Sequence, residues 1–287
     1  MDVNSSDKWF MEEDLVKIIQ DYNAVIAGLD FFSERVIERA NKLKIIARRG
    51  IGFDKIDLAS CRKKGILVTN TPVSQEHQAV AEFTIGLIFD VIRNITPSSQ
   101  SLKNGSWERA KFLGQGITDI TVGILGLGNI GKRVAKLLTV LGTHVIYTDP
   151  YVNDPTYEKV DLQQLFKQSD VLTIHVPKTS ETVGMVNREV LSLMKKGSRI
   201  VNTARGEVIN MMDLIDFVNN GTIKSVALDV FDVEPPNYID LIRGEHFLTT
   251  PHIAAYTSIS FEKIDEICYR NVLNTLLGRG EIKFLVY

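Results

Sequence analysis

Residues 121–138 read TVGILGLGNIGKRVAKLL, and this stretch decides the fold of the later part of the chain. An apolar strand pattern leads into Gly126, Gly128 and Gly131, which have the spacing G-x-G-x-x-G, and an amphipathic helix pattern follows. The first glycine permits a tight turn, the second lets the backbone approach a pyrophosphate, and the third lets the helix pack closely on the strand. Free N–H groups at the helix start would bind phosphate. The stretch therefore predicts a dinucleotide-binding unit.

A carboxylate follows at the distance that this motif requires. Asp149 ends the next apolar run, about 20 residues beyond the glycines. Such a residue accepts hydrogen bonds from the adenosine ribose hydroxyls and repels a 2′-phosphate, so we expect NAD rather than NADP. The alternative is a glycine-rich turn that serves packing only, with Asp149 capping a turn.

Composition excludes several classes of protein. The chain has 287 residues, of which 44% are hydrophobic and 24% charged, and its net charge is -2. These values are ordinary for globular domains and exclude disorder, collagen or coiled coil as descriptions of the whole chain. Without a basic surplus or an apolar run of about 20 residues, we expect neither a nucleic-acid partner nor a membrane span. Cys61 and Cys268 lie far apart, so we expect no metal site and a cytoplasmic location.

Short apolar runs alternate with helical patterns along the chain, which predicts an α/β protein with parallel sheets. From Thr121 onward, six strand candidates separated by helix candidates form the doubly wound, Rossmann pattern. The first part has fewer candidates, and its polar start leads straight into a helical pattern at 15–19. We therefore expect a smaller, flavodoxin-like first domain that lacks its opening strand. The six strand candidates are 121–125, 144–148, 171–175, 199–202, 225–229 and 247–249.

A domain boundary is expected after a long helix. Apolar residues recur at helical spacing over 79–95, and Thr96-Pro97-Ser98-Ser99 breaks the pattern. We place the dinucleotide-binding domain at 97–260. The other domain is discontinuous and comprises 1–96 plus 261–287, with the tail 282–286 as a candidate strand that returns to it.

Three residues with useful chemistry follow strands of the second domain. They are Arg205 in VNTARGEVIN, Glu234 in ALDVFDVEPP and His252 in TTPHIAAYT. Carboxyl ends of parallel strands form the crevice where doubly wound sheets bind ligands. A guanidinium can hold a carboxylate, an imidazole can transfer a hydroxyl proton near neutral pH, and a carboxylate can orient the imidazole. Each residue alone is as readily a surface or structural residue, but together they form the set that a dehydrogenase needs.

Seven segments, taken in order, carry a resemblance to a known family. The chain resembles the D-isomer-specific 2-hydroxyacid dehydrogenases, and especially the D-3-phosphoglycerate dehydrogenase-like members. The segments are RRGIGFDKID (48–57), NTPVSQEHQAVAE (70–82), GILGLGNIG (123–131), HVP (175–177), NTARGEVI (202–209), ALDVFDVEPP (227–236) and TPHIAAYT (250–257).

The resemblance implies an NAD-dependent enzyme that interconverts a D-2-hydroxy acid and its 2-oxo acid, with 3-phosphoglycerate among the candidate substrates. It implies that Arg205, Glu234 and His252 are catalytic, that the first domain is a lid, and that a homodimer forms through the cofactor domain. It places the substrate on Arg48, Arg49, Gly50, Ile51 and Gly52, where backbone N–H groups hold the carboxylate. It places cofactor contacts at Ile51, Gly126, Gly128, Asn129, Ile130, Gly131, Asp149, His175, Val176, Pro177, Thr203, Ala204, Arg205, Asp229, His252, Ala254 and Ala255.

Some positions depart from the family pattern. Ala254 and Ala255 stand where glycines are common, and Lys55 replaces the usual asparagine. Arg49 adds a second positive charge beside Arg48; it is either a solvated surface residue or a contact for a doubly anionic substrate such as a phosphorylated acid. Two other functions stay open: a dehydrogenase of the same fold that acts on formate or phosphite, and a non-catalytic NAD-binding scaffold like the corepressor relatives of the family.

Overall fold

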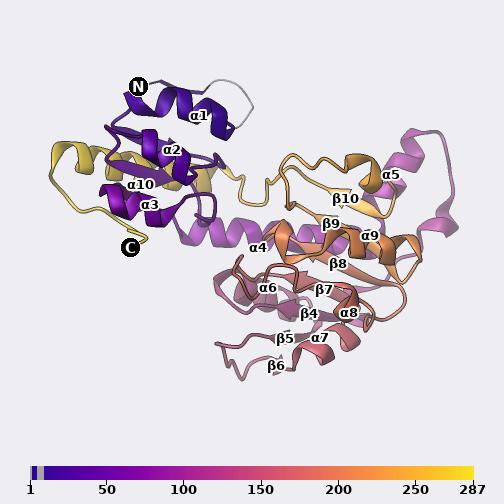
Figure 1. Ribbon diagram of the computed structural model, residues 1–287. Coiled ribbons are helices and arrows are strands. Elements are labelled where there is room, and N and C mark those ends of the chain that lie inside the picture. The colour runs from indigo at the N-terminus through magenta and orange to yellow at the C-terminus, as the bar shows by residue number, and fades with distance from the viewer. Residues whose placement is uncertain (1, 5–9) are drawn as a thin grey trace. The chain divides into compact units, whose positions relative to one another are not determined.

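The structure is a computed structural model that describes residues 2–4 and 10–287 (Figure 1). The chain is an α/β protein built on two parallel sheets. It divides into two compact units: unit 1 comprises Met1–Glu76 and Tyr256–Tyr287, and unit 2 comprises His77–Ala255.

The long helix α4 (Ser74–Arg93) belongs almost entirely to unit 2. The chain therefore changes unit near the start of this helix, about one helix length before the boundary at residue 96 that the sequence suggested, and returns at Tyr256 rather than at 261. The reason is the apolar face of α4, which packs into the core beneath strand β4 (Thr121–Leu125). The buried α4 residues in that core are Ala81, Leu87, Ile88, Val91 and Ile92.

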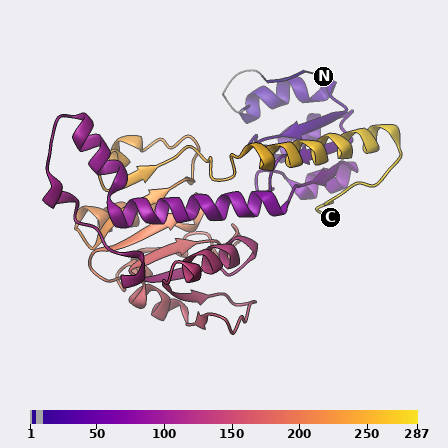
Figure 2. The ribbon, with the colours of Figure 1, turned by 180° about the vertical axis from the view of Figure 1, so that it is seen from behind.

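Unit 1 is a three-stranded parallel sheet covered on both faces. One face packs on helices α1, α2 and α3, and the other on α10, which Figure 2 shows running along the sheet. Ile46 faces the first group and Ala47 faces α10, as the alternation of a strand requires. In the described residues no strand precedes β1. The elements are α1 (Glu12–Ile18), η1 (Ile19–Asp21), β1 (Ala24–Ala27), α2 (Glu34–Arg39), β2 (Ile45–Arg48), α3 (Leu58–Lys64), β3 (Leu67–Thr69) and α10 (Ser258–Leu277).

The C-terminal tail does return to unit 1, but with little regular structure. Thr69 and Leu285 form a single antiparallel bridge, and the Val286 N–H donates to the Val68 carbonyl over 2.9 Å. The strand expected at 282–286 is thus reduced to one bridge beside β3.

Unit 2 is a seven-stranded sheet in the order β10-β9-β8-β7-β4-β5-β6, and its neighbouring strands run parallel. The chain leaves β4 toward β5 on one side and later returns to β7 on the other side. The order therefore reverses between β4 and β7, and open sheets bind ligands outside the strand ends at such a point. The other strands are β5 (His144–Thr148), β6 (Glu158–Lys159), β7 (Val171–Ile174), β8 (Ser198–Asn202), β9 (Ile223–Leu228) and β10 (Phe247–Thr249).

Helices cover both faces of this sheet. Side chains of α4 and α6 form the core on one face, and side chains of α7, α8 and α9 form the core on the other. The short strand β6 has two exposed residues and no apolar run, so sequence patterning missed it. The remaining elements are α5 (Ile95–Lys103), η2 (Arg109–Phe112), η3 (Ile117–Asp119), α6 (Asn129–Val140), α7 (Leu162–Gln168), α8 (Arg188–Leu191), η4 (Gly206–Val208), α9 (Met211–Asn219) and η5 (Ile239–Ile242).

Several helices begin at a side chain that accepts a backbone N–H of the first turn, which satisfies donors that the helix itself cannot pair. These caps fix where each loop ends and each helix starts. The residues are Ser33, Asp57, Asp161, Asn187, Asn210 and Thr257.

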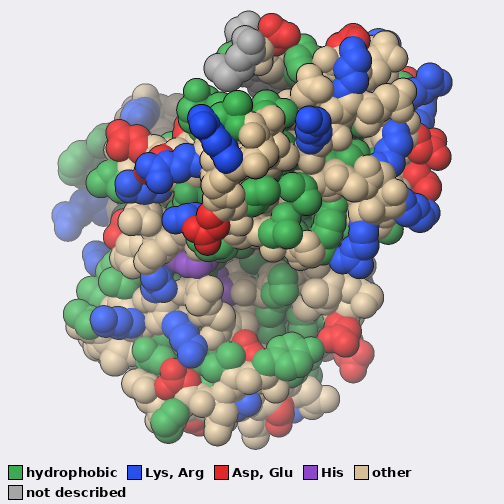
Figure 3. All heavy atoms as spheres, turned by 90° about the vertical axis from the view of Figure 1, so that its left-hand side faces the viewer, with side chains coloured by type: hydrophobic (Ala, Val, Ile, Leu, Met, Phe, Trp, Pro, Cys, Tyr) green, Lys and Arg blue, Asp and Glu red, His purple; other side chains and the backbone are tan. Residues whose placement is uncertain are grey.

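The surface carries both signs of charge. On the face drawn in Figure 3, Lys and Arg side chains are interspersed with Asp and Glu side chains and with apolar ones. Within the described residues, no helix has the length and apolar character needed to cross a membrane.

Candidate active site

The glycine loop (126–131) joins β4 to α6 at the reversal of strand order. Gly126 has φ +93°, and a Cβ there would lie 2.8 Å from Val176 Cγ1. A Cβ on Gly131 would lie 2.2 Å from the Gly126 carbonyl oxygen. A Cβ on Gly128 would meet nothing within 4 Å, although this residue caps α6. Two glycines are therefore required by the fold itself, and the third leaves open space at the helix start, which fits the pyrophosphate of NAD.

The Asp149 carboxylate ties this loop to the turn that follows β5. Its Oδ2 accepts the Leu127 N–H over 2.8 Å, and its Oδ1 accepts the N–H groups of Tyr151 and Val152 over 2.8 and 2.9 Å. The carboxylate lies beside the glycine loop, where the motif predicts it. Its contact with a ribose stays a prediction.

The segment after β7 lines the other side of the glycine loop. A Cβ on Gly126 would come within 3.0 Å of the His175 backbone, so the two segments are in close contact. His175 Nε2 lies 2.9 Å from Thr173 Oγ1, and burial lowers the pKa of this imidazole to about 3. The ring is therefore neutral at physiological pH. It is better suited to form an uncharged part of the surface beside the glycine loop than to transfer a proton.

His252 and Glu234 form a hydrogen-bonded pair in unit 2. His252 Nδ1 lies 3.0 Å from Glu234 Oε1, and their side chains are 27% and 12% exposed. Glu234 Oε1 also accepts the Phe231 N–H over 3.2 Å, which fixes the carboxylate to its own loop. His252 follows β10, and Glu234 lies in the loop after the neighbouring strand β9.

The buried carboxylate of Asp229, directly after β9, organises the His252 loop. It accepts the Thr250 hydroxyl over 2.6 Å and the N–H groups of Ile253 and Ala254 over 2.9 and 2.8 Å. The His252 N–H donates to the Asp229 carbonyl over 2.9 Å. His252 itself has φ +55°, a left-handed conformation that costs a non-glycine residue about 1 kcal/mol or more. Burial raises the pKa of Asp229. The sequence suggested a cofactor contact for Asp229, and the structure also makes it the anchor of this loop.

Arg205 lies on the loop after β8, beside the Glu234 loop. The Asn202 side-chain amide donates to the Arg205 carbonyl over 2.9 Å, which shapes the turn. A Cβ on Gly206 would lie only 1.9 Å from the Phe231 carbonyl carbon, so the loops after β8 and β9 touch at this glycine. The loops that carry Arg205, Glu234 and His252 thus follow three adjacent strands at one edge of the unit 2 sheet.

Thr203, in the same loop as Arg205, is connected to helix α4. Its hydroxyl lies 2.9 Å from that of Thr84, and both residues are buried. Thr84 also donates to the Val80 carbonyl over 2.8 Å within the helix. This contact fixes the start of the Arg205 loop to the helix layer of unit 2.

In unit 1, the loop at 48–52 follows β2; it is called the substrate loop here because the sequence predicts that it binds substrate. The Gly50 N–H donates to Thr71 Oγ1 over 2.8 Å, so this amide is already engaged. The Ile51 carbonyl accepts the Asn70 side-chain amide over 2.8 Å. Among the hydrogen bonds of the described residues, none uses the N–H of Ile51 or Gly52. The N–H groups of Ile51 and Gly52 are therefore the remaining candidates for binding an anion in this loop.

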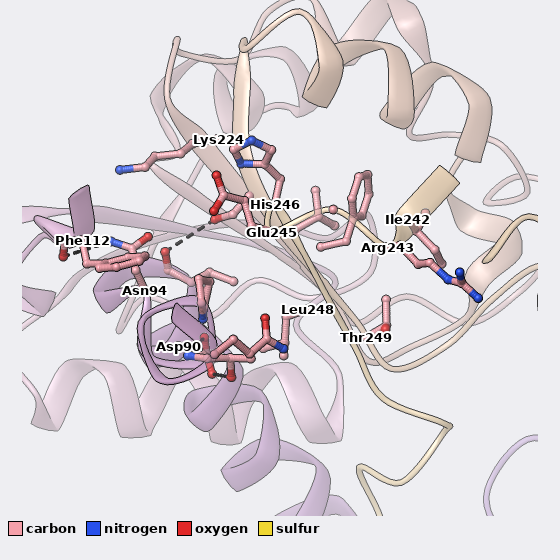
Figure 4. A pocket seen from close by; sticks show the side chains of 18 of the residues that line it. Asp90, Asn94, Phe112, Lys224, Ile242, Arg243, Glu245, His246, Leu248 and Thr249 are labelled. Atoms are coloured by element: carbon pink, nitrogen blue, oxygen red, sulfur yellow. Dashed lines mark hydrogen bonds between the residues drawn. The ribbon is translucent and has the colours of Figure 1, made fainter. Parts of the chain in front are cut away.

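A separate pocket of about 370 Å³ lies beside β10, the edge strand of the unit 2 sheet (Figure 4). Asp90 of α4 and Asn94 directly after this helix line one part, and Glu245 and His246 before β10 line another. The Arg205, Glu234 and His252 side chains do not line it. Sequence patterning gave no sign of this pocket, because its walls come from segments that are far apart in the chain.

Both cysteines are free and buried. Burial raises the pKa of Cys61 and of Cys268 to about 12, so neither is a thiolate at neutral pH. Within the described part of the chain, no three His, Cys, Asp or Glu side chains gather as metal ligands would. The expectation that the protein uses no metal stays a prediction.

Comparison with known proteins decides the family. Residues 85–254 match the model of the D-isomer specific 2-hydroxyacid dehydrogenase NAD binding domain. The chain belongs to the D-isomer specific 2-hydroxyacid dehydrogenase family. This confirms the predicted family and the α/β fold, and the matching model is that of an NAD-binding domain.

The relatives that the chain matches are named for different substrates. The chain is 37% identical over 278 residues to a D-3-phosphoglycerate dehydrogenase of Methanocaldococcus jannaschii, covering 94% of this chain and 52% of that protein. It is 40% identical over 255 residues to a hydroxypyruvate reductase of Thermotoga maritima, covering 86% and 82%. A solved D-lactate dehydrogenase from Aquifex aeolicus, complexed with NAD and lactic acid, superposes with a TM-score of 0.86 at 31% identity, covering 94% and 88%. The chain spans about half the length of the phosphoglycerate dehydrogenases that it matches.

Substitutions in the glycine loop separate folding from cofactor binding. Gly131→Ala should lower the free energy of unfolding by about 1–3 kcal/mol, because its Cβ meets a backbone oxygen. Gly128→Ala should unfold like the parent protein yet weaken NADH binding tenfold or more, by about 1.4 kcal/mol. Thermal unfolding and fluorescence titration with NADH measure the two effects. Gly244→Ala, which also meets nothing within 4 Å, is the control. Parent-like NADH affinity in Gly128→Ala would contradict the placement of the pyrophosphate.

Proposed function

We propose that the protein is an NAD-dependent oxidoreductase that interconverts a D-2-hydroxy acid and its 2-oxo acid. The observation that carries this proposal is the His252–Glu234 pair at the same sheet edge as the glycine loop, in a member of this family. NAD bound at the glycine loop would accept hydride in oxidation of the hydroxy acid and, as NADH, supply it in reduction.

His252 transfers the proton in this proposal. Glu234 accepts a hydrogen bond from Nδ1–H, which leaves Nε2 as the nitrogen that faces a substrate oxygen. In reduction, protonated His252 donates its Nε2 proton to the 2-oxo oxygen and becomes neutral. In oxidation, neutral His252 takes the hydroxyl proton at Nε2.

Cationic and amide groups hold the substrate. The planar Arg205 guanidinium binds the carboxylate or the 2-oxo oxygen and stabilises the negative charge that develops there, an effect of about 3 kcal/mol for comparable donors. The N–H groups of Ile51 and Gly52 bind the substrate carboxylate, since successive free amides form an anion-binding concavity. Asp149 accepts the adenosine ribose hydroxyls with the acceptor capacity that its three backbone contacts leave.

The substrate in this proposal is a short 2-oxo acid or the matching D-2-hydroxy acid. The names of the relatives point to hydroxypyruvate, 3-phosphohydroxypyruvate and pyruvate as assay substrates. We propose the cytoplasm as the location, because free, buried thiols such as Cys61 and Cys268 are typical of reducing compartments.

The partner that we propose is a second copy of the chain. Helix α5 and the segment after it extend beyond the unit 2 sheet in Figures 1 and 2. Apolar side chains on this segment are strongly exposed, with Trp107 at 77% and Leu113 at 81%. We infer that these exposed apolar side chains belong to the association surface. The pocket beside β10, which Lys111 and Phe112 help to line, lies next to this segment.

Replacing His252 tests the catalytic proposal. His252→Ala should lower kcat for reduction of a 2-oxo acid by about 10²–10⁴, the usual contribution of a general acid, while NADH still binds. Loss of NADH absorbance with a panel of 2-oxo acids measures the rate, and His246→Ala, in the pocket beside β10, is the control. A kcat for His252→Ala within about tenfold of the parent would reject His252 as the proton donor. NADH binding without turnover of any acid would favour the scaffold function.

Replacing the exposed apolar residues tests the dimer. Sedimentation velocity should give the parent protein twice the chain mass of 32.2 kDa. The double variant Trp107→Ser/Leu113→Ser should sediment as a monomer, because it removes apolar surface from the association face. Val140→Ser, which alters an equally exposed apolar residue on α6, should remain dimeric. A parent protein that sediments as a monomer would overturn the proposal.

A further inference from the structure

Arg49, on the substrate loop, is held by α10. Its Nη2 donates to Asp265 Oδ2 over 2.8 Å, and its Nε donates to Asp265 Oδ1. The guanidinium carbon lies 4.2 Å from the centre of the Phe261 ring. The Tyr256 and Phe261 rings pack edge to face, with their centres 4.6 Å apart. Phe261 and Asp265 are one helical turn apart, so both lie on the same face of α10. A bidentate ion pair and an aromatic face thus fix one arginine in one orientation.

The ion pair with Asp265 neutralises the positive charge that Arg49 would otherwise offer to a ligand. The hydrogen bond to Asp265 raises the pKa of Arg49, so the guanidinium is charged and matched by one carboxylate. The neighbouring Arg48 is also turned inward, because its Nη1 donates to the Arg49 carbonyl oxygen. Gly50 leaves room for this arrangement, since a Cβ there would lie 2.6 Å from Arg48 Nη1. The guanidinium groups of Arg48 and Arg49 are therefore both engaged within the protein, and they are not two freely available binding groups for an anionic ligand.

Acidic groups accompany these arginines at the same edge of the unit 1 sheet. Asp265 has a side chain that is 53% exposed, so its carboxylate is open to a ligand that approaches Arg49. Asp30 follows β1, and its carboxylate accepts the N–H groups of Phe10 and Gly28. Because β1 and β2 are parallel, Asp30 and Arg49 follow strands that end at the same edge. A second anionic group on a substrate would meet negative as well as positive charge there.

We propose that Asp265 determines substrate specificity by neutralising Arg49, and that it restricts the enzyme to 2-oxo acids with a single negative charge. The inference rests on the proposed function, in which the amides of the substrate loop bind the carboxylate. The second negative charge of a phosphorylated acid would have to displace Asp265 from Arg49 or lie beside it. Like-charge juxtaposition of this kind is a means of rejecting a competing ligand.

The ion pair between Arg49 and Asp265 is not needed for the stability of unit 1. An exposed pair contributes little to stability, so its loss would leave the fold intact. Substitution of Asp265 therefore frees the guanidinium without unfolding unit 1, since Phe261 and the backbone bond from Arg49 N–H to the Ala27 carbonyl, 2.8 Å long, remain.

The experiment compares hydroxypyruvate with its 3-phosphate, two acids that differ by one phosphoryl group. The quantity is the ratio of kcat/KM for the phosphate to kcat/KM for hydroxypyruvate, measured with NADH. The parent should prefer hydroxypyruvate. Asp265→Asn should raise the ratio about tenfold, equivalent to 1.4 kcal/mol, chiefly through a lower KM for the phosphate. In Asp265→Asn/Arg49→Gln the ratio should fall back, because the freed guanidinium is gone.

Glu266→Gln is the matched control. It removes the same charge one position along α10, where Glu266 pairs with Lys263 and Arg270, and it should leave the ratio at the parent value. A parent that prefers the phosphate, or an Asp265→Asn ratio equal to that of Glu266→Gln, would overturn the specificity role while the proposed function stands. Absence of turnover with every 2-oxo acid would overturn the proposed function, and this inference with it.

Discussion

The candidate site depends on the hydrogen bonds of one buried residue, Asp229. It holds the hydroxyl of Thr250 and two consecutive amides, and its own backbone carbonyl accepts the N–H of His252. These contacts offset the cost of placing His252 at φ +55°. In this conformation His252 Nδ1 lies 3.0 Å from Glu234 Oε1. The imidazole that we propose to be catalytic is thus positioned by a residue that need not touch the reacting atoms.

The same principle of a carboxylate that fastens a loop recurs at the cofactor side. Asp149 joins the glycine loop to the turn after β5 through three backbone amides. The strand order places both loops at the carboxyl edge of one sheet, so a dinucleotide on the first would lie along the edge that carries His252. In unit 1, Asp265 fastens a side chain in a similar way and thereby changes the charge that the substrate loop presents.

Local patterning predicted those features that short stretches determine. The strands 121–125, 144–148 and 247–249 agree with the structure, because each has a strong apolar run bounded by clear breaks. The boundary at residue 96 differed from the division of the chain into units, since a helix pattern does not reveal which core its apolar face joins. Strand β6 escaped notice because two exposed residues carry no period.

In the candidate site, too, some features could be predicted from short stretches of sequence and others could not. Gly126, Gly128 and Gly131 were predictable because a single turn determines their roles. The pairing of His252 with Glu234 was a hypothesis from strand ends, and the structure supplies the distance. The engagement of the Gly50 amide by Thr71, and of Arg49 by Asp265, could not be predicted, because each joins residues that only the tertiary fold brings together.

Nitrogen-15 NMR of histidine-labelled protein shows which nitrogen of the His252 ring carries the proton, and therefore whether the ring is oriented by Glu234. The His252 signals can be assigned by comparison with a His252→Gln sample. The neutral ring should carry its proton on Nδ1, donated to Glu234, and have an unprotonated Nε2. A ring protonated on Nε2, or the mixture of tautomers found in free imidazole, would contradict it.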